Sequence, residues 1–349
     1  MKGRRILLIV ATILVVGLFT TACDSDEKKV NLNAQYDYLV LVNKYSQLPD
    51  DWEKNVKLVS TQDAWGDEIK VEKEAFEQFK KLKDEVDTEL KELNTTIELD
   101  STYRSVKEQQ KLWDDWANDP EKGIDYVRKF VAVPGYSEHH TGLAIDICLK
   151  KDGKLVYDND EMIAEREIFA KVHAKLSKYG FILRYLENRD TITGYSYEPW
   201  HLRYVGDEKI AKEIMDKDIT FEEYLESVED IHSTHEAAKY KIEKALQENL
   251  KDAYGEKISN SRFNVTKIYT TEENKKEPIK SLNLGKKDVA FEVTFQLQPS
   301  SGTNPEELII TDGEYDEGLG WVKNIRRIGI LKYNSKNNTY TIENLGTGW

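Results

Sequence analysis

The spacing of apolar residues predicts alternating helices and strands over the first two thirds of the chain. Between Val71 and Leu93, apolar residues recur every three or four positions among many charges, as in an amphipathic helix with one buried stripe. Further helices are predicted over about 105–116, 163–178 and, as two charged helices, 207–230. Strands are predicted at Leu39–Val42, Thr96–Asp100, Phe181–Tyr185 and Trp200–Val205, and along the alternating residues Leu143, Ile145 and Ile147.

A different order of elements begins near Ser233. One long helix over about Thr234–Asp252 precedes four strand-like stretches at 263–269, 289–297, 327–333 and 339–342. One helix followed by an antiparallel sheet indicates a small α+β domain. We therefore expect an α+β protein of two domains, residues 34–230 and 234–349. The first should hold a small antiparallel sheet with helices packed around it, and the role of the second is not predicted.

The first residues predict an export signal. Three basic residues, Lys2, Arg4 and Arg5, precede an apolar run over Ile6–Phe19, which is too short for a membrane span but fits a signal peptide. Small residues then precede Cys23, and this resembles the bacterial lipoprotein signal, in which the cysteine carries the lipid. A plain signal anchor is the alternative. We expect a signal peptide over 1–22, a lipidated Cys23, a tether over 23–33 and a position on the extracytoplasmic face of the membrane.

Charge and cysteine content narrow the classes of partner. The 349 residues carry a formal net charge of −14, which becomes three units more negative without residues 1–22. Such a chain repels nucleic acid and anionic head groups, so neither is an expected partner, and membrane contact should come from the lipid. Lipidation of Cys23 leaves Cys148 alone in a strand-like run. We predict that Cys148 is a buried small hydrophobe and that the chain has no disulfide.

Two of the six histidines stand in a pattern that suits metal binding. His139 and His201, together with Asp146, supply two imidazoles and a carboxylate, a sound three-ligand set for zinc that leaves a fourth position for water or substrate. Gly142 allows the chain to turn between His139 and Asp146. Glu198 stands three residues before His201 and is predicted to take a proton from a water activated by the metal, without itself being a ligand.

These residues form a recognisable signature. The pattern Ser137-x-His139-x-x-Gly142-x-Ala144-x-Asp146, followed by Glu198-x-x-His201, resembles that of VanY-type D-Ala-D-Ala carboxypeptidases and their L,D-carboxypeptidase relatives. The segment Ser101-Thr102-Tyr103-Arg104-Ser105, with Gln109 five residues beyond the arginine, resembles a further part of that family. The similarity spans roughly residues 36–206.

The resemblance implies a role for each matched residue. His139, Asp146 and His201 would bind zinc, Glu198 would act as general base and acid, and Arg104 would stabilise the oxyanion formed when water attacks the scissile carbonyl. Gln109 and Ser137 would hold the substrate. The spacing favours His139 over its neighbour His140, which we expect to face the cleft or solvent.

The expected function is that of a zinc-dependent carboxypeptidase releasing a C-terminal D-alanine from peptidoglycan stem peptides. Cleavage of a D,D bond in a pentapeptide and of an L,D bond in a tetrapeptide both fit these motifs. An endopeptidase of the same chemistry and a non-catalytic cell-wall-binding lipoprotein are the alternatives. A cation and an amide closing the cleft would demand a free carboxylate on the substrate, and Arg104, Gln109 and Arg184 are the candidates for that task.

Overall fold

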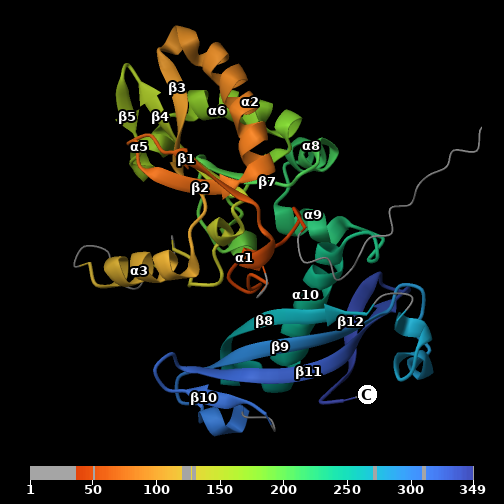
Figure 1. Cartoon of the computed structure of the whole chain (residues 1–349). Coiled ribbons are helices and arrows are strands. Elements are labelled where there is room, and N and C mark those ends of the chain that lie inside the picture. Colours follow the sequence, from red (N-terminus) through yellow and green to blue (C-terminus); the bar gives the residue numbers. More distant parts are fainter. Residues whose placement is uncertain are drawn as a thin grey trace, which may run out of the picture.

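The chain forms two units, each with its own antiparallel sheet (Figure 1). The computed structural model describes residues 37–49, 52–119, 127, 131–269, 273–308 and 312–348. The predicted signal peptide, the tether and Cys23 lie outside these residues and stay predictions. Among the described helices, none is both long and apolar enough to cross a bilayer. We call residues 37–230 the N-terminal unit and residues 235–348 the C-terminal unit.

The N-terminal unit is built on a five-stranded sheet with helices around it. Its strands run in the order β3 (Thr95–Ser101), β4 (Ala144–Lys151), β7 (His201–Tyr204) and β6 (Phe181–Leu183), and β5 (Lys154–Val156) pairs with β4. A separate hairpin consists of β1 (Leu58–Gln62) and β2 (Glu68–Glu72). The helices are α1 (Trp52–Asn55), α2 (Lys73–Leu90), α3 (Val106–Ala117), α5 (Asn159–Ala164), α6 (Arg166–Leu176), α7 (Asp190–Thr193), α8 (Glu208–Lys217) and α9 (Phe221–Ser227).

Helix α2 shows how the apolar pattern determines the packing of this unit. Its buried residues include Phe79, Leu82, Val86 and Leu90, which recur on one face and join the same core as Ile97 of β3. Each such fully buried side chain contributes roughly 1.5–3 kcal/mol. The predicted amphipathic helix is therefore confirmed. Cys148 of β4 belongs to this core as a fully buried free thiol, as predicted.

The strand predicted at Leu39–Val42 is wrong. These residues are buried, but they form no strand. Their backbone groups bond to charged side chains instead: the Leu41 N–H donates to Glu236 Oε2 at 3.0 Å, and Arg203 Nη2 donates to the Val40 carbonyl at 2.7 Å. Because these side chains satisfy the buried backbone, the segment needs no neighbouring strand.

The C-terminal unit consists of one long helix against a second five-stranded sheet. Helix α10 (His235–Tyr254) comes first, and the strands run in the order β10 (Glu314–Asp316), β11 (Trp321–Asn334), β9 (Val289–Pro299) and β8 (Ile258–Ile268), with β12 (Thr339–Gly346) paired to β11. Ile242 and Leu246 of the helix share a core with Phe263, Phe291 and Phe295 of the sheet. Both units thus confirm the α+β prediction.

The two units meet along the edge of β8. The Phe263 N–H donates to the Tyr45 carbonyl at 3.0 Å, and the Gln47 N–H donates to the Phe263 carbonyl at 3.3 Å. Ser46 forms a parallel bridge with Phe263. Residues 45–47 of the N-terminal unit therefore lie along the side of β8 that β9 does not occupy.

Candidate active site

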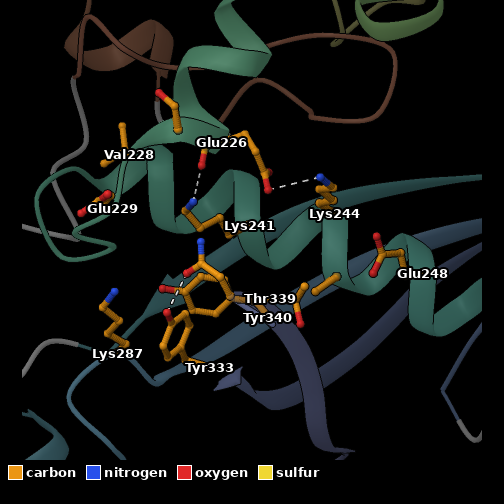
Figure 2. A pocket seen from close by; sticks show the side chains of 13 residues that line it. Glu226, Val228, Glu229, Lys241, Lys244, Glu248, Lys287, Tyr333, Thr339 and Tyr340 are labelled. Atoms are coloured by element: carbon orange, nitrogen blue, oxygen red, sulfur yellow. Dashed lines mark hydrogen bonds and ion pairs between the residues drawn. The ribbon is translucent and has the colours of Figure 1, made fainter. Parts of the chain in front are cut away.

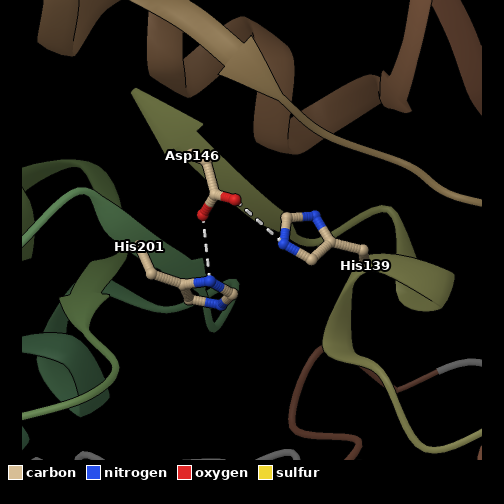
Figure 3. Close-up of side chains that lie close together, drawn as sticks. All are labelled: His139, Asp146 and His201. Carbon is tan, nitrogen blue, oxygen red and sulfur yellow. Dashed lines mark ion pairs between the residues drawn. The ribbon is translucent and has the colours of Figure 1, made fainter. Parts of the chain in front are cut away.

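Strand pairing brings two of the three predicted metal ligands together. Asp146 of β4 and His201 of β7 are directly opposite one another in the antiparallel register. Cross-strand neighbours of this kind project from the same face of a sheet. The third residue, His139, comes from a 3₁₀ turn over Glu138–Thr141. One ligand atom from each of His139, Asp146 and His201 lies within 4.8 Å of the others (Figure 3).

A glycine closes the turn that carries His139. Gly142 has φ +72°, a left-handed conformation that strains other residues, and its N–H donates to the His139 carbonyl. A Cβ added there would lie 2.9 Å from Leu58 Cδ2 and 3.3 Å from the Glu72 backbone nitrogen. At the other end of the turn, Ser137 Oγ accepts the His139 N–H at 3.3 Å. The predicted turn at Gly142 is therefore present, and it brings the His139 side chain to Asp146 of β4.

Hydrogen bonds to the far nitrogens orient both imidazoles. His139 Nδ1 lies 2.6 Å from the Thr102 carbonyl oxygen, which can only accept, so Nδ1 carries the proton. His201 Nε2 lies 3.3 Å from Glu138 Oε2 and donates to that carboxylate. The other ring nitrogens, His139 Nε2 and His201 Nδ1, both face Asp146. Carbonyl and carboxylate partners of this type commonly orient metal-binding histidines.

The donor set fits a zinc ion. His139 Nε2 lies 3.1 Å from Asp146 Oδ2, and His201 Nδ1 lies 2.9 Å from Asp146 Oδ1. Asp146 Oδ1 is buried and has no hydrogen-bond donor. Burial opposes ionisation of Asp146, but His139 and His201 outweigh it and hold the pKa of this carboxyl below its usual range. Two imidazole nitrogens and a carboxylate that converge in this way match a three-ligand zinc site.

Glu198 lies beside this donor set without joining it. A turn in which the His201 N–H donates to the Glu198 carbonyl brings the two side chains together, with Glu198 Oε2 at 3.6 Å from His201 Nδ1. Burial raises the pKa of the Glu198 carboxyl to about 8, an effect that His201 opposes and Asp146 reinforces. A three-ligand metal centre with a carboxylate of raised pKa next to it can activate water, which is the arrangement of a metal-dependent hydrolase.

Arg104, Gln109 and Ser137 line the same cavity, which has a volume of about 320 Å³. Arg104 Nη1 donates to Gln109 Oε1 at 2.9 Å, and Arg104 Nη2 donates to Ser101 Oγ at 3.0 Å. The Gln109 amide nitrogen donates to the Ala132 carbonyl at 2.7 Å. Both ends of the Gln109 amide are therefore engaged, and its clearest role in this structure is to hold Arg104.

Two residues lie elsewhere than the sequence suggested. Arg184 is fully buried, is absent from the cavity lining, and donates to Glu138 and, through two nitrogens, to Glu222. This placement argues against the predicted contact of Arg184 with substrate. His140 faces neither cleft nor solvent: it is buried, with Nδ1 2.6 Å from the Arg104 carbonyl, and its Nε2 accepts the Gly135 N–H.

A group of buried charges that the sequence pattern did not predict lies behind His201. Glu138 Oε1 accepts from Arg184 Nε at 2.7 Å and from Arg203 Nη1 at 2.8 Å, while Oε2 faces His201. Burial would raise the pKa of Glu138, but the two guanidinium groups outweigh it and hold that pKa below its usual range. Glu222 of α9 then pairs with Arg184. The one signal in the sequence is an acidic residue directly before His139, which by itself does not reveal its distant partners.

Comparison with known proteins agrees with the class of enzyme that this geometry defines. A family model described as "VanY: D-alanyl-D-alanine carboxypeptidase" matches residues 68–207. The chain is 37% identical over 215 residues to YodJ of Bacillus subtilis (strain 168), which is named as a carboxypeptidase, and the match covers 59% of this chain and 75% of YodJ. The chain therefore belongs to the VanY family of D-alanyl-D-alanine carboxypeptidases, and it is a carboxypeptidase.

Two further proteins are similar to parts of this chain. The bifunctional D-Ala-D-Ala dipeptidase and D-Ala-D-Ala carboxypeptidase VanXYC of Enterococcus gallinarum is 47% identical over 116 residues, which covers 33% of this chain and 58% of VanXYC. Among solved structures, the LD-carboxypeptidase LdcB is 37% identical with a TM-score of 0.46, covering 55% of this chain and 86% of LdcB.

A second cavity of about 430 Å³ lies where α9 meets the C-terminal unit (Figure 2). Its wall includes Lys241 and Lys244 of α10 and the tyrosine pair Tyr333 and Tyr340, whose ring centroids are 5.2 Å apart. Lys244 pairs with Glu226 at 3.2 Å. No histidine or cysteine is among its described lining residues, so this cavity lacks the imidazole donors of the first one.

Proposed function

We propose that this protein is a zinc-dependent carboxypeptidase that removes a C-terminal D-alanine from peptidoglycan stem peptides. The observation that carries the proposal is the convergence of His139, Asp146 and His201 on one point, with Glu198 beside them, in a chain of the VanY family. The name of the relative VanXYC supports the D-Ala-D-Ala ending of the substrate.

The residues around the cavity have different roles in the proposed reaction. A zinc ion held by His139, Asp146 and His201 would supply Lewis acidity toward water and toward the scissile carbonyl. Glu198 takes the proton from the attacking water and returns it to the leaving amine, a role that fits its position beside the donor set and outside it. Arg104, held by Gln109 and Ser101, balances the negative charge that develops on the carbonyl oxygen.

The way in which the cavity holds the end of the substrate distinguishes a carboxypeptidase from an endopeptidase. Among the described residues that line the cavity, Arg104 is the one with a permanent positive charge. An arginine on the cavity wall can pair with a free carboxylate at the end of a substrate, a group that an internal segment of a stem lacks. This supports a carboxypeptidase rather than an endopeptidase. Both a D,D bond and an L,D bond place a D-alanine carboxylate at that end.

The proposal includes a lipid anchor at Cys23 that holds the enzyme on the extracytoplasmic face of the membrane. Its support is the basic, apolar and small-residue pattern of residues 1–23. A Cys23→Ala variant should lose the lipid mass at the N-terminus and leave the membrane fraction. An unmodified Cys23 in wild-type protein would remove this part of the proposal.

The experiment that tests the function is mass spectrometry of defined stem peptides incubated with residues 24–349, with and without a chelator. Loss of one alanine that stops when the chelator is added, and returns with zinc, is the expected result. A shortened pentapeptide indicates D,D cleavage, and a shortened tetrapeptide indicates L,D cleavage. A folded, zinc-loaded sample that shortens neither peptide would overturn the carboxypeptidase assignment for these substrates and favour the endopeptidase or the binding protein.

A further inference from the structure

Helix α3 presents an apolar surface to the substrate cavity. Leu112 and Trp116 follow Gln109 by three and seven positions, a spacing that puts all three residues on one face of the helix. Each of the three lines the cavity. Gln109 is buried, but Leu112 and Trp116 are only half-buried. Part of both apolar side chains is therefore open to a substrate.

Two further residues extend this apolar surface. Val131 and Ala132 line the same cavity, Val131 as a buried and Ala132 as a half-buried residue. The Gln109 amide nitrogen donates to the Ala132 carbonyl at 2.7 Å, and this bond ties their segment to α3. We call Leu112, Trp116, Val131 and Ala132 the apolar corner of the cavity.

The apolar corner lies next to Arg104. The Gln109 amide that binds Ala132 through its nitrogen accepts Arg104 Nη1 through its oxygen at 2.9 Å. One side chain thus connects the guanidinium group to the corner. The backbone N–H of Arg104 donates to the carbonyl of His139, a metal ligand, at 3.1 Å. Arg104 therefore contacts the segment that carries the metal ligand as well as the residue that holds the corner.

This arrangement suits the last residue of a peptide. Its carboxylate and its side chain are attached to the same Cα, so a carboxylate that pairs with Arg104 brings the side chain close to the neighbouring wall. The side chains of the apolar corner that are open to the cavity are hydrocarbon and aromatic. Such a surface stabilises a buried methyl group, whereas a polar or charged side chain would lose its hydration there.

We propose that the apolar corner is the subsite for the side chain of the terminal residue, and that Leu112 and Trp116 determine the preference for alanine at that position. This inference rests on the proposed function. It gives α3 a part in substrate selection that is separate from zinc binding and from proton transfer.

The test measures kcat/KM of the zinc-loaded full-length chain for two stem peptides that differ only in their last residue, D-alanine or glycine. One carbon in an apolar subsite changes kcat/KM by about ten-fold or more, so the wild type should prefer the alanine peptide by about ten-fold. Leu112→Ala and Trp116→Ala should each lower that preference at least about three-fold. Leu112→Met keeps the apolar volume and should preserve it.

Two control variants on the same helix match these changes. Trp113→Ala and Val106→Ala alter residues of α3 that do not line the cavity, and both should keep the wild-type preference. The preference compares two substrates on one preparation, so a smaller folded or zinc-loaded fraction cancels. A purely structural role of Leu112 or Trp116 would therefore leave the preference unchanged.

A second pair of peptides, which differ in the residue before the cleaved bond, shows on which side of that bond the corner acts. An effect of Leu112→Ala and Trp116→Ala on this pair alone would overturn the inference. A preference for D-alanine over glycine that neither variant changes would overturn it as well.

Binding separates the failure of this inference from that of the proposed function. Calorimetry in a Glu198→Ala background compares the affinities for the alanine and glycine peptides without turnover. If the wild type releases no alanine but Leu112→Ala and Trp116→Ala reduce the difference in Kd, the carboxypeptidase function fails and the subsite stands. If the wild type releases alanine but the variants change neither ratio, the subsite fails and the function stands.

Discussion

Replacing Glu138 by glutamine should uncouple the metal site from the charges that support it. Glu138 is buried, and its two oxygens contact Arg184 at 2.7 Å, Arg203 at 2.8 Å and His201 at 3.3 Å. Glutamine preserves the shape of the side chain but removes the negative charge. Arg184 then keeps Glu222, whereas the described partners left to Arg203 are the carbonyls of Tyr38, Val40 and Tyr204.

The size of the effect follows from the burial of these partners. Removing one member of a buried ion pair strands the other charge and typically costs about 3–5 kcal/mol. For a domain of this size, that lowers the melting temperature by on the order of 10 °C. His201 also loses a charged acceptor at Nε2. Loss of such a partner commonly weakens metal binding by about 10–100-fold.

Urea unfolding of the metal-free protein and competitive zinc titration measure the two effects separately. Glu187→Gln is the matched control, because Glu187 also pairs with an arginine, Arg166 at 2.6 Å, but both side chains are exposed. Removing that pair should cost less than about 1 kcal/mol and leave zinc affinity unchanged. A Glu138→Gln protein with the stability and zinc affinity of the control would refute the argument that buried charge supports this site.

Three further outcomes are expected. Glu198→Ala should lower kcat by about 10²–10⁴-fold while zinc stays bound, since this residue moves the proton and is outside the ligand set; near-normal turnover would remove it as the base. Ser105→Ala should cost about 1 kcal/mol in urea unfolding, because Ser105 Oγ caps α3, and Ser105→Thr should restore most of it; an unchanged midpoint would show that the cap contributes nothing. Burial raises the pKa of Glu243 from 4.5 to about 8, partly opposed by Lys239, so the folded state holds this proton where the unfolded chain releases it. The stability from that proton is complete below pH 4.5 and is lost as pH rises through 8. The melting temperature of Glu243→Gln should therefore rise relative to that of wild type between pH 5 and 8.5. Melting temperatures of the two proteins that change in parallel with pH would contradict the raised pKa of Glu243.

The sequence revealed those parts of the fold and site that depend on local pattern. The stripe of α2 and the cap residues Ser105 and Thr234 determine their helices largely by themselves. The motifs around His139, Asp146 and His201 identified the residues that the sheet and the 3₁₀ turn bring together. By contrast, the hairpin of β1 and β2 was missed, because most of its residues are exposed or half-buried and the alternation in β2 is only five residues long.

Long-range pairing explains the errors. Arg184 was predicted to contact substrate because the sequence near a catalytic motif does not distinguish an arginine that binds substrate from one in a buried ion pair. Its partners, Glu138 and Glu222, are 46 and 38 residues away in sequence. Leu39–Val42 is apolar enough for a strand, but the bond from Leu41 to Glu236 spans 195 residues. Apolar pattern predicts burial and does not specify which group will satisfy the backbone.

The pairing of residues 45–47 with the edge of β8 determines where the chain can be shortened. The exposed side of an outer strand is a template on which other chains can add, and proteins commonly block it. Here the backbone of Tyr45 and Gln47 blocks it at Phe263. A chain that begins at residue 48 would keep the family-matched region and the C-terminal unit but uncover this template. We expect such a shortened protein to self-associate. Residues 45–47 would thus prevent aggregation through a strand that lies more than two hundred positions further along the sequence.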